Sequence, residues 1–468
     1  MRSVSTNYLS RSNQIHICPM QKLRDFSSCA CRIANLRWWI GILLILIIGS
    51  QPALSDAISA TTALQVARNY LSRTSLRNSR PAEPELKLVY AATAETRLPS
   101  DTSLWKGDFF VIDIGNEAGF IIVAGDDRMY PILGRTDRGH FDLHDLPGNM
   151  QGLLEGYQHV AYWLSSYEGV ADETTRQQWK ALLEGTQEPV VPVQRLNTAP
   201  WGQGYPFNAA CPVIEGVRTA AGCGPVAAAI LCHYHRFPSQ VDSQRATSEY
   251  LGLPVPTGPI DWDHIQEEYT DAHSLDQIET DAIGNLLWQL GANMQASYTA
   301  HGTKNDFLKL FLSLLDVFSF SPSSLCYVRD HYNPASWYRR IKQELAAGCP
   351  VLYYAASTLS AHEFIIDGYD SSEAFHINWG WNGHYDGYYR LDALHPDLLQ
   401  ETGAGSYAAG HRMLCMHPAD GATERIRDLI GSQLSVTPDI PTPEQKNQLS
   451  FRFENSGIRI FRLKLGHS

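Results

Sequence analysis

The stretch Ala-Gly-Cys-Gly-Pro-Val-Ala-Ala-Ala-Ile, residues 221–230, predicts a helix that begins at a cysteine. Gly222 and Gly224 flank Cys223, so a substrate backbone can approach the thiol closely. Pro225 is favoured in a first helical turn, and the alanines after it are strong helix formers. The helix dipole and the free N–H groups of that turn stabilise a thiolate. We therefore expect the pKa of Cys223 to be lowered and the thiol to be nucleophilic.

A histidine and an asparagine further along the chain give this cysteine chemical partners. His362 opens a run that predicts a strand, and it follows Cys223 by 139 residues, within the roughly 130–150 typical of papain-type enzymes. An imidazole at that place takes the thiol proton and later protonates the leaving amine. Asn378 follows His362 by 16 residues, about one hairpin further on, where its side-chain carbonyl can orient the second imidazole nitrogen. The neighbouring indole of Trp379 can shield that bond from water.

A glutamine ahead of the cysteine completes the pattern. Gln203 lies in the Gly-rich segment Pro-Trp-Gly-Gln-Gly-Tyr, 20 residues before Cys223. Its amide can donate to the oxyanion of a tetrahedral intermediate together with the backbone N–H of Cys223, and one such donor is worth about 10²–10³ in rate. Each signal has a structural alternative: a buried cysteine, a structural histidine, or core tryptophans at Trp379 and Trp381. The order Gln, Cys, His, Asn at these spacings favours a nucleophilic cysteine site.

Composition and charge point to an exported globular protein. The 468 residues are 44% hydrophobic and 18% charged, which predicts two or three domains. The net charge is −12, and because residues 1–55 carry +5 the remainder carries −17, which argues against a nucleic-acid partner. A basic stretch leads into an apolar run over residues 38–48, and small residues follow at 53–55. A membrane span needs about 20 apolar residues, so residues 1–55 predict a signal peptide and no stable membrane insertion after its removal.

Six cysteines follow the predicted signal peptide, and none of them belongs to a CxxC pair. We therefore expect no zinc cluster, and no metal or organic cofactor. If one thiol stays free for chemistry, the other five cannot all pair, so a disulfide scaffold is not expected either. The interpretation is a large domain with mostly buried thiols and one reactive one. The six are Cys211, Cys223, Cys232, Cys326, Cys349 and Cys415.

The order of predicted elements divides the chain after the signal peptide into three parts. Residues 56–190 predict one α+β unit, with helices near 58–71 and 150–164 and strands at 86–90, 109–114 and 120–124. Residues 184–197, with two prolines, predict a linker. Residues 191–418 predict a larger α+β unit in which helices (223–235, 283–290, 336–347) precede strands (351–355, 364–366, 375–377, 388–391), which favours an antiparallel sheet. Residues 419–468 predict a tail or a small β fragment.

These motifs resemble the streptopain family of papain-like cysteine peptidases. The matching segments are 201–208, 221–223, 233–238, His362 with 364–368, 378–381 and 386–394, and, in the first unit, 120–133 and 153–157. The resemblance implies a papain-like catalytic domain, a helical part plus an antiparallel sheet, preceded by an inhibitory α+β prodomain that proteolysis removes. It implies protein or peptide substrates and the chain's own prodomain as inhibitor. By position it implies the following roles: Cys223 nucleophile, His362 base, Gln203 oxyanion donor, Asn378 and Trp379 orienting and shielding the base, and Gly222, Ala361 and Trp381 contacting substrate.

One departure from the family lies beside the base. Glu363 follows His362 where a small residue is usual, and we expect its carboxylate to raise the pKa of His362 or to alter specificity. We expect activation by cleavage between about residues 185 and 198, where the backbone is exposed. Two alternatives keep the fold: an amidase or acyl transferase, and a catalytically inactive surface-binding protein.

Overall fold

The computed structural model describes residues 57–73, 85–93, 107–115, 117–269, 275–356, 361–393, 409–419, 431–437 and 448–453. All of them belong to one compact unit that spans residues 55–468. The predicted signal peptide, residues 1–55, lies outside the described residues. Within the described part of the chain, no helix combines the length and the apolar character needed to cross a bilayer.

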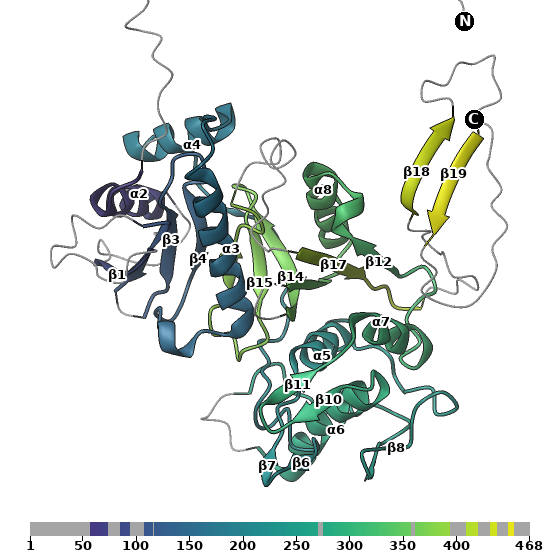
Figure 1. The fold of residues 1–468 in the computed structure, drawn as a ribbon. Helices are drawn as coiled ribbons and strands as arrows, with labels where there is room; N and C mark the ends of the chain where they lie inside the picture. The colour runs from purple at the N-terminus through teal and green to yellow at the C-terminus, as the bar shows by residue number, and fades with distance from the viewer. Residues whose placement is uncertain are drawn as a thin grey trace, which may run out of the picture. The chain divides into compact units, whose positions relative to one another are not determined.

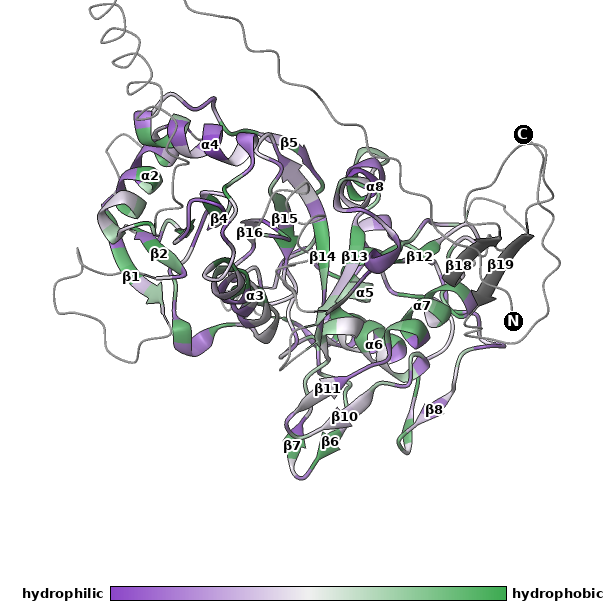
Figure 2. Cartoon of the chain, turned by 45° about the horizontal axis from the view of Figure 1, so that its top comes forward, coloured by the Kyte–Doolittle hydropathy of each residue, from purple (hydrophilic) through white to green (hydrophobic). Residues whose placement is uncertain are grey.

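A buried helix begins at the cysteine, as predicted. Helix α5 (Cys223–His235) follows Gly222, whose φ of +97° is left-handed, and a Cβ there would lie 2.9 Å from Thr303 Cγ2. The turn into the helix therefore requires glycine. Helix α5 is hydrophobic on nearly all sides because it packs between α6 (Gln277–Asn293), α7 (Phe307–Asp316) and the sheet. In Figure 2 the same hydrophobic character is visible along α7, whereas α4 and α8, which bury one face only, carry long hydrophilic stretches.

One eleven-stranded antiparallel sheet runs through the described residues (Figure 1). Its strand order is β1-β2-β3-β4-β16-β15-β14-β13-β17-β12, and β5 pairs with β14. This confirms the predicted fold class, helices together with an antiparallel sheet. The strands are β1 (Leu86–Ala92), β2 (Phe109–Ile114), β3 (Phe120–Ala124), β4 (Ile132–Thr136), β5 (Pro192–Arg195), β12 (Leu325–Val328), β13 (Val351–Ala356), β14 (Ala361–Asp370), β15 (Phe375–Asn378), β16 (Gly387–Tyr389) and β17 (Ala409–Cys415).

Strand β14 separates two hydrophobic cores, because its side chains alternate across the sheet. Ile365 packs on the face that α5, α6 and α7 cover. Phe364 and Ile366 point to the opposite face, where α3 (Gly148–Leu164) and α8 (Pro334–Ala346) contact the strand. The position of a residue on β14 therefore decides which set of helices its side chain meets.

Strands β4 and β16 form the seam between the sheet strands before residue 190 and those after it. Arg135 is buried in this seam, 4.2 Å from the centre of the Tyr388 ring, and its guanidinium bonds Asp137 at 2.8 Å. A Cβ on Gly134 would lie 2.4 Å from the Tyr389 ring, so glycine lets the two strands approach. From α3, Tyr157 Oη donates to backbone carbonyl oxygens on both sides of the seam, at 2.9 and 2.6 Å.

Two capped helices are stacked beside strands β1 to β3. Helix α2 (Ala60–Ser72) starts at Ser59, whose hydroxyl accepts from a backbone N–H of the first turn, and it packs on β1, β2 and β3. Helix α4 (Glu173–Glu184) starts at Asp172 in the same way, ends at Gly185 with φ +68°, and packs on α2.

The segment predicted as a linker contains a strand. Residues 192–195 form β5 and pair with β14, although three of their four side chains are exposed. Because so little of β5 is buried, its sequence carries no alternation of apolar and polar residues. The short elements are η3 (Leu143–Asp145), β6 (Val213–Ile214), β7 (Val217–Arg218), β8 (Glu249–Tyr250), β9 (Leu253–Pro254), β10 (Ser297–Thr299), β11 (Gly302–Lys304), η4 (Arg329–His331) and, in the tail, the paired strands β18 (Gly431–Thr437) and β19 (Gln448–Phe453).

Candidate active site

The thiol of Cys223 bonds a carboxyl group of the sheet. Its Sγ donates to Glu363 Oε2 at 3.0 Å, and Asn305 Nδ2 donates to the other carboxyl oxygen at 2.9 Å. Asn305 reaches this place because Gly224 has no side chain: a Cβ there would lie 2.2 Å from Asn305 Oδ1. Helix α5, strand β14 and the segment after β11 thus supply one group each to a closed cluster.

Burial and the neighbouring carboxyl group control the ionisation of this cluster. Burial, then the charge of Glu363, raises the pKa of the Cys223 thiol well above its ordinary value. Burial also raises the pKa of Glu363. The expected lowering of the thiol pKa by the helix start is therefore wrong for this state of the protein, because desolvation and a nearby carboxylate outweigh the helix dipole. The thiol is held neutral.

His362 lies on the other face of β14, away from Cys223. Its partner across the ladder is Ala355, which packs in the core that α3 and α8 cover, whereas Glu363 pairs with Tyr354 on the α5 side. Both ring nitrogens of His362 are buried without a hydrogen-bond partner among the described residues. The structure therefore does not bring the sulfur and the imidazole together.

The first residue of helix α3 covers the His362 ring. A Cβ on Gly148 would lie 2.7 Å from His362 Nε2, so the helix backbone sits directly against the imidazole. Burial lowers the pKa of His362 to about 4. We expected Glu363 to raise this pKa. This part of the expectation is wrong, because the carboxyl group lies on the opposite side of the strand and burial dominates. The alternative, an effect of Glu363 on specificity, stays a prediction.

Asn378 is buried and does not bond His362. Its Nδ2 donates to Thr198 Oγ1 at 3.0 Å and to the carbonyl of Ala199 at 2.9 Å, and its Oδ1 accepts from the N–H of Gly380 at 3.0 Å. On the ladder it faces Ile365, which places it on the α5 side of the sheet. The amide is therefore fixed on the face that carries Cys223.

The two tryptophans near Asn378 differ in their surroundings. Trp379 is fully buried and packs on Phe364, two residues beyond His362, with ring centres 5.0 Å apart. Trp381 is 36% exposed, so it is not a core aromatic residue. The backbone N–H of the next residue, Asn382, donates to the carbonyl of Trp201 at 3.0 Å, which ties this turn to the loop that carries Gln203.

The Gln203 loop is anchored beside the start of α5. The carbonyl of Gln203 accepts from the N–H of Ala221 at 2.9 Å, two residues before Cys223. A Cβ on Gly202 would lie 2.3 Å from Asn382 Oδ1, so glycine is needed for the close approach of the two loops. Gly222 occupies the turn before Cys223, and Ala361, the first residue of β14, is exposed beside His362.

Two contributors to the site were absent from the sequence interpretation. Asn305 directly follows strand β11 and carries no motif. Gly148 belongs to a distant helix that the sequence predicted only from residue 150, and nothing local in its sequence indicates contact with His362. All six cysteines after the predicted signal peptide are free.

Comparisons with known proteins agree with this architecture. A family model described as the Peptidase C10 family matches residues 201–389, and one described as a Spi protease inhibitor matches residues 55–161. The thiol protease/hemagglutinin PrtT of Porphyromonas gingivalis is 27% identical over 402 residues, which cover 78% of this chain and 42% of that protein. Streptopain of Streptococcus pyogenes is 28% identical over 313 residues, 62% of this chain and 75% of that protein.

The chain thus spans less than half the length of the first of these relatives. Among solved structures, a prointerpain A fragment from Prevotella intermedia superposes with a TM-score of 0.53 at 19% identity. That match covers 71% of this chain and 98% of the fragment, and it establishes a common fold.

Proposed function

The chain belongs to the streptopain family of papain-like cysteine peptidases, and we propose that it is an exported zymogen in which Cys223 attacks peptide bonds with His362 as general base. In this proposal residues 1–55 direct export, residues 56–190 are the inhibitory prodomain, and residues 191–418 are the catalytic domain. The observation that carries the proposal is the contact between Gly148 of α3 and the His362 ring. A helix of the first unit covers the base, while the thiol is bonded elsewhere.

Removal of the prodomain uncovers the face of β14 on which His362 lies. His362 is the second residue of β14 and pairs with Ala355, close to the end of β13. Its turn towards Cys223 opens the end of the β13–β14 ladder, where Ala356 pairs with Ala361, Ala355 with His362, and Tyr354 with Glu363. Strand ends open at low cost, so this change does not require the core of the sheet to unfold.

Once the imidazole reaches the sulfur, a proton can pass from the thiol to the imidazole. His362 takes the proton of Cys223, and the thiolate attacks the carbonyl carbon of the substrate. The amide of Gln203 and the N–H of Cys223 donate to the resulting oxyanion. His362 then protonates the leaving amine, and water hydrolyses the thioester to release the acid and restore the thiol. Asn378 and Trp379 orient and shield the imidazole, and Gly222, Ala361 and Trp381 contact the substrate.

The activation cleavage falls between about residues 185 and 198. Gly185 ends α4, and the residues that follow it up to β5 are mostly exposed, among them Thr186, Glu188 and Pro189. Exposed backbone of this kind is open to proteolysis. Strand β5 stays with the catalytic domain after cleavage on its N-terminal side, because it is paired with β14.

The match to a protease-inhibitor model favours a peptidase over an amidase or acyl transferase with the same fold. An attached inhibitor guards against uncontrolled proteolysis, a hazard that those two reactions do not present. The inactive surface-binding protein is the other alternative, and it requires Cys223 to remain unreactive after processing.

The test compares the purified chain with the Cys223→Ala variant over time by mass spectrometry and N-terminal sequencing. The parent chain processes itself between residues 185 and 198 and then hydrolyses unfolded protein, and the variant does neither. Cys326→Ser, which changes another free thiol, is the matched control and behaves as the parent. Full activity of Cys223→Ala overturns the assignment, and transfer of acyl groups to added amines without hydrolysis favours the transferase.

A further inference from the structure

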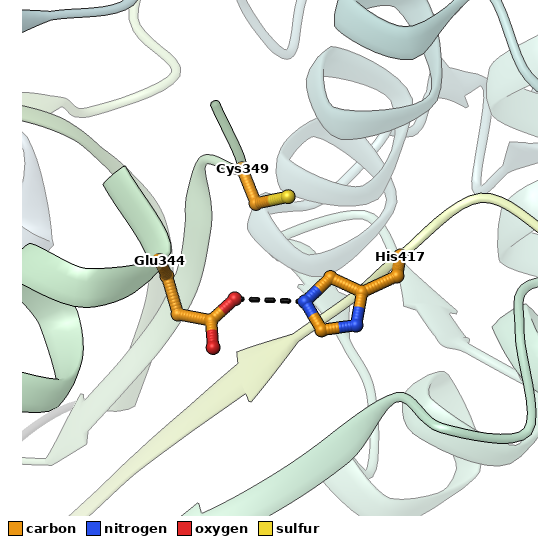
Figure 3. Close-up of side chains that lie close together, drawn as sticks. All are labelled: Glu344, Cys349 and His417. Atoms are coloured by element: carbon orange, nitrogen blue, oxygen red, sulfur yellow. Dashed lines mark hydrogen bonds and ion pairs between the residues drawn. The ribbon is translucent and has the colours of Figure 1, made fainter. Parts of the chain in front are cut away.

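Three side chains of the kinds that can bind transition metals meet at one end of the sheet, apart from the Cys223 site (Figure 3). They are Glu344 in the last turn of α8, Cys349 just before β13, and His417 just after β17. His417 Nε2 lies 2.8 Å from Glu344 Oε2, and one donor atom of each of the three residues lies within 4.8 Å of the other two. All three are partly buried.

The backbone fixes the positions of these residues. Helix α8 ends at Ala346, and Gly348 with φ +78° reverses the chain so that the N–H of Cys349 donates to the carbonyl of Glu344 at 3.0 Å. Strands β13 and β17 pair Val351 with Cys415, and the same register continued by two residues sets Cys349 opposite His417.

His417 is also held by its own backbone. Its N–H donates to Ser324 Oγ at 3.0 Å, and its carbonyl accepts from the N–H of Ser321 at 2.9 Å. The three candidate ligands are therefore presented by ordered backbone rather than by free surface side chains.

The orientation of the groups distinguishes a metal site from a second catalytic triad. In a Cys–His–Glu triad the thiol and the carboxylate bond opposite nitrogens of the imidazole. In Figure 3 the sulfur of Cys349 and the carboxylate of Glu344 both lie towards the His417 nitrogen that bonds Glu344, and the second nitrogen points away from them. Donor atoms that converge on one point are what a cation needs.

We propose that Glu344, Cys349 and His417 bind a zinc ion, with the fourth position open to water. Thiolate, imidazole and carboxylate together suit zinc, whose ligands lie at about 2.0–2.3 Å and are separated from one another by about 3–4 Å. Zinc displaces the proton of the Cys349 thiol and takes the place of any proton on His417 Nε2. The ion joins helix α8 to the end of β17, where the chain continues into the residues after 418. No short-spaced motif marks these ligands, because they are 5 and 68 residues apart.

The experiment uses the purified, tag-free zymogen with Cys223→Ala, which removes the active-site thiol and self-processing. Titration with Co²⁺ as a spectroscopic probe for zinc should give one ion per chain, with the sulfur-to-cobalt charge-transfer absorption of a thiolate ligand. Added Zn²⁺ should abolish that absorption by displacement and raise the melting temperature by several degrees. Absence of the sulfur band in this unsubstituted site overturns the proposal without any further variant.

Variants then identify the ligands. Cys349→Ser should lose the charge-transfer band, and Glu344→Gln and His417→Ala should each weaken Co²⁺ binding at least tenfold. Cys326→Ser, a partly exposed thiol on the neighbouring strand β12, should keep both the band and the affinity. An unchanged band in Cys349→Ser, or loss of the band in Cys326→Ser alone, places the metal elsewhere and overturns the assignment.

Discussion

The Sγ atom of Cys223 donates a hydrogen bond of 3.0 Å to Oε2 of Glu363, the residue that directly follows His362 on β14. Neighbouring residues of a strand point to opposite faces, so the strand cannot present both Glu363 and His362 to the sulfur at the same time. In the described state the carboxyl group has the place beside the thiol, and α3 holds the imidazole on the other side. In the proposed activation, His362 replaces Glu363 beside the sulfur.

The first prediction concerns the charge of Glu363. Glu363→Gln keeps the shape of the side chain but removes the negative charge that raises the pKa of the Cys223 thiol. A lower pKa gives more thiolate at pH 7. We therefore expect alkylation of Cys223 by iodoacetamide in the intact zymogen to become at least several-fold faster, measured by peptide mass spectrometry. The control Glu373→Gln changes an exposed carboxylate away from the site, and equal rates in the two variants would contradict the prediction.

The second prediction concerns acid stability of the zymogen. The pKa of His362 is about 4 in the folded chain and 6.5 in the unfolded one, so only the unfolded chain takes up this proton between those values. The free energy of unfolding therefore decreases as pH falls from 6.5 towards 4. Burial of His362 accounts for a decrease of about 2 kcal/mol at pH 5. In the Cys223→Ala background, His362→Gln should lose less stability than its parent between pH 7 and 5 in urea unfolding.

His233 and His235 also have pKa values lowered to about 4 by burial. They contribute equally to both chains of that comparison, so the difference between the two chains reports His362 alone. The same loss of stability on acidification in both chains would show that the imidazole is not buried against α3.

The third prediction concerns the contact between α3 and the base. A Cβ on Gly148 would lie 2.7 Å from His362 Nε2, so Gly148→Ala forces the helix start and the imidazole apart. We expect faster self-processing of the purified zymogen, followed by gel electrophoresis. Gln151→Ala, an exposed position in the next residues of the same helix, should process at the parental rate. A Gly148→Ala chain that processes more slowly than the parent would count against an inhibitory role for this contact.

The fourth prediction concerns the turn into α5. Gly222 has φ +97°, and a Cβ there meets the side chain of Thr303. Gly222→Ala should cost about 1–3 kcal/mol in the free energy of unfolding, from backbone strain and the steric clash. Thr303→Ser removes the Cγ2 atom and keeps the hydroxyl that donates to the carbonyl of Ala220, so the double variant should recover part of the loss. No recovery would mean that the strain lies in the backbone alone.

Local sequence signals predicted many of the helices and strands. Glycines on both sides of Cys223 and the proline after it located the start of α5 to the residue. Strands β2 and β3 coincide with two predicted apolar runs, of which the first ends before Gly115 and the second begins after Gly119. Helices α4 and α7 were missed although their signals were present: Asp172 and Gly185 cap α4, and the apolar residues of α7 recur at helical spacing.

The arrangement of the site could not be predicted in the same way. The face of β14 to which His362 points depends on the pairing register with β13 and on contact with Gly148, 214 residues earlier in the chain. Asn305, which bonds Glu363, and the cluster of Glu344, Cys349 and His417 are assembled only by packing. Sequence spacing predicts which residues carry the chemistry, and the tertiary structure decides which of them are in contact.

The most direct test of the exchange at the sulfur is the pH dependence of Cys223 alkylation in the intact zymogen and in the processed enzyme. Both forms can be followed in one sample, because peptide mass spectrometry after separation by size distinguishes them. The account predicts that the zymogen thiol reacts quickly only above its ordinary pKa of about 9, since burial and Glu363 keep it neutral. In the processed enzyme it should react quickly already near pH 6, as a thiolate paired with His362. The same pH profile in both forms would contradict the account.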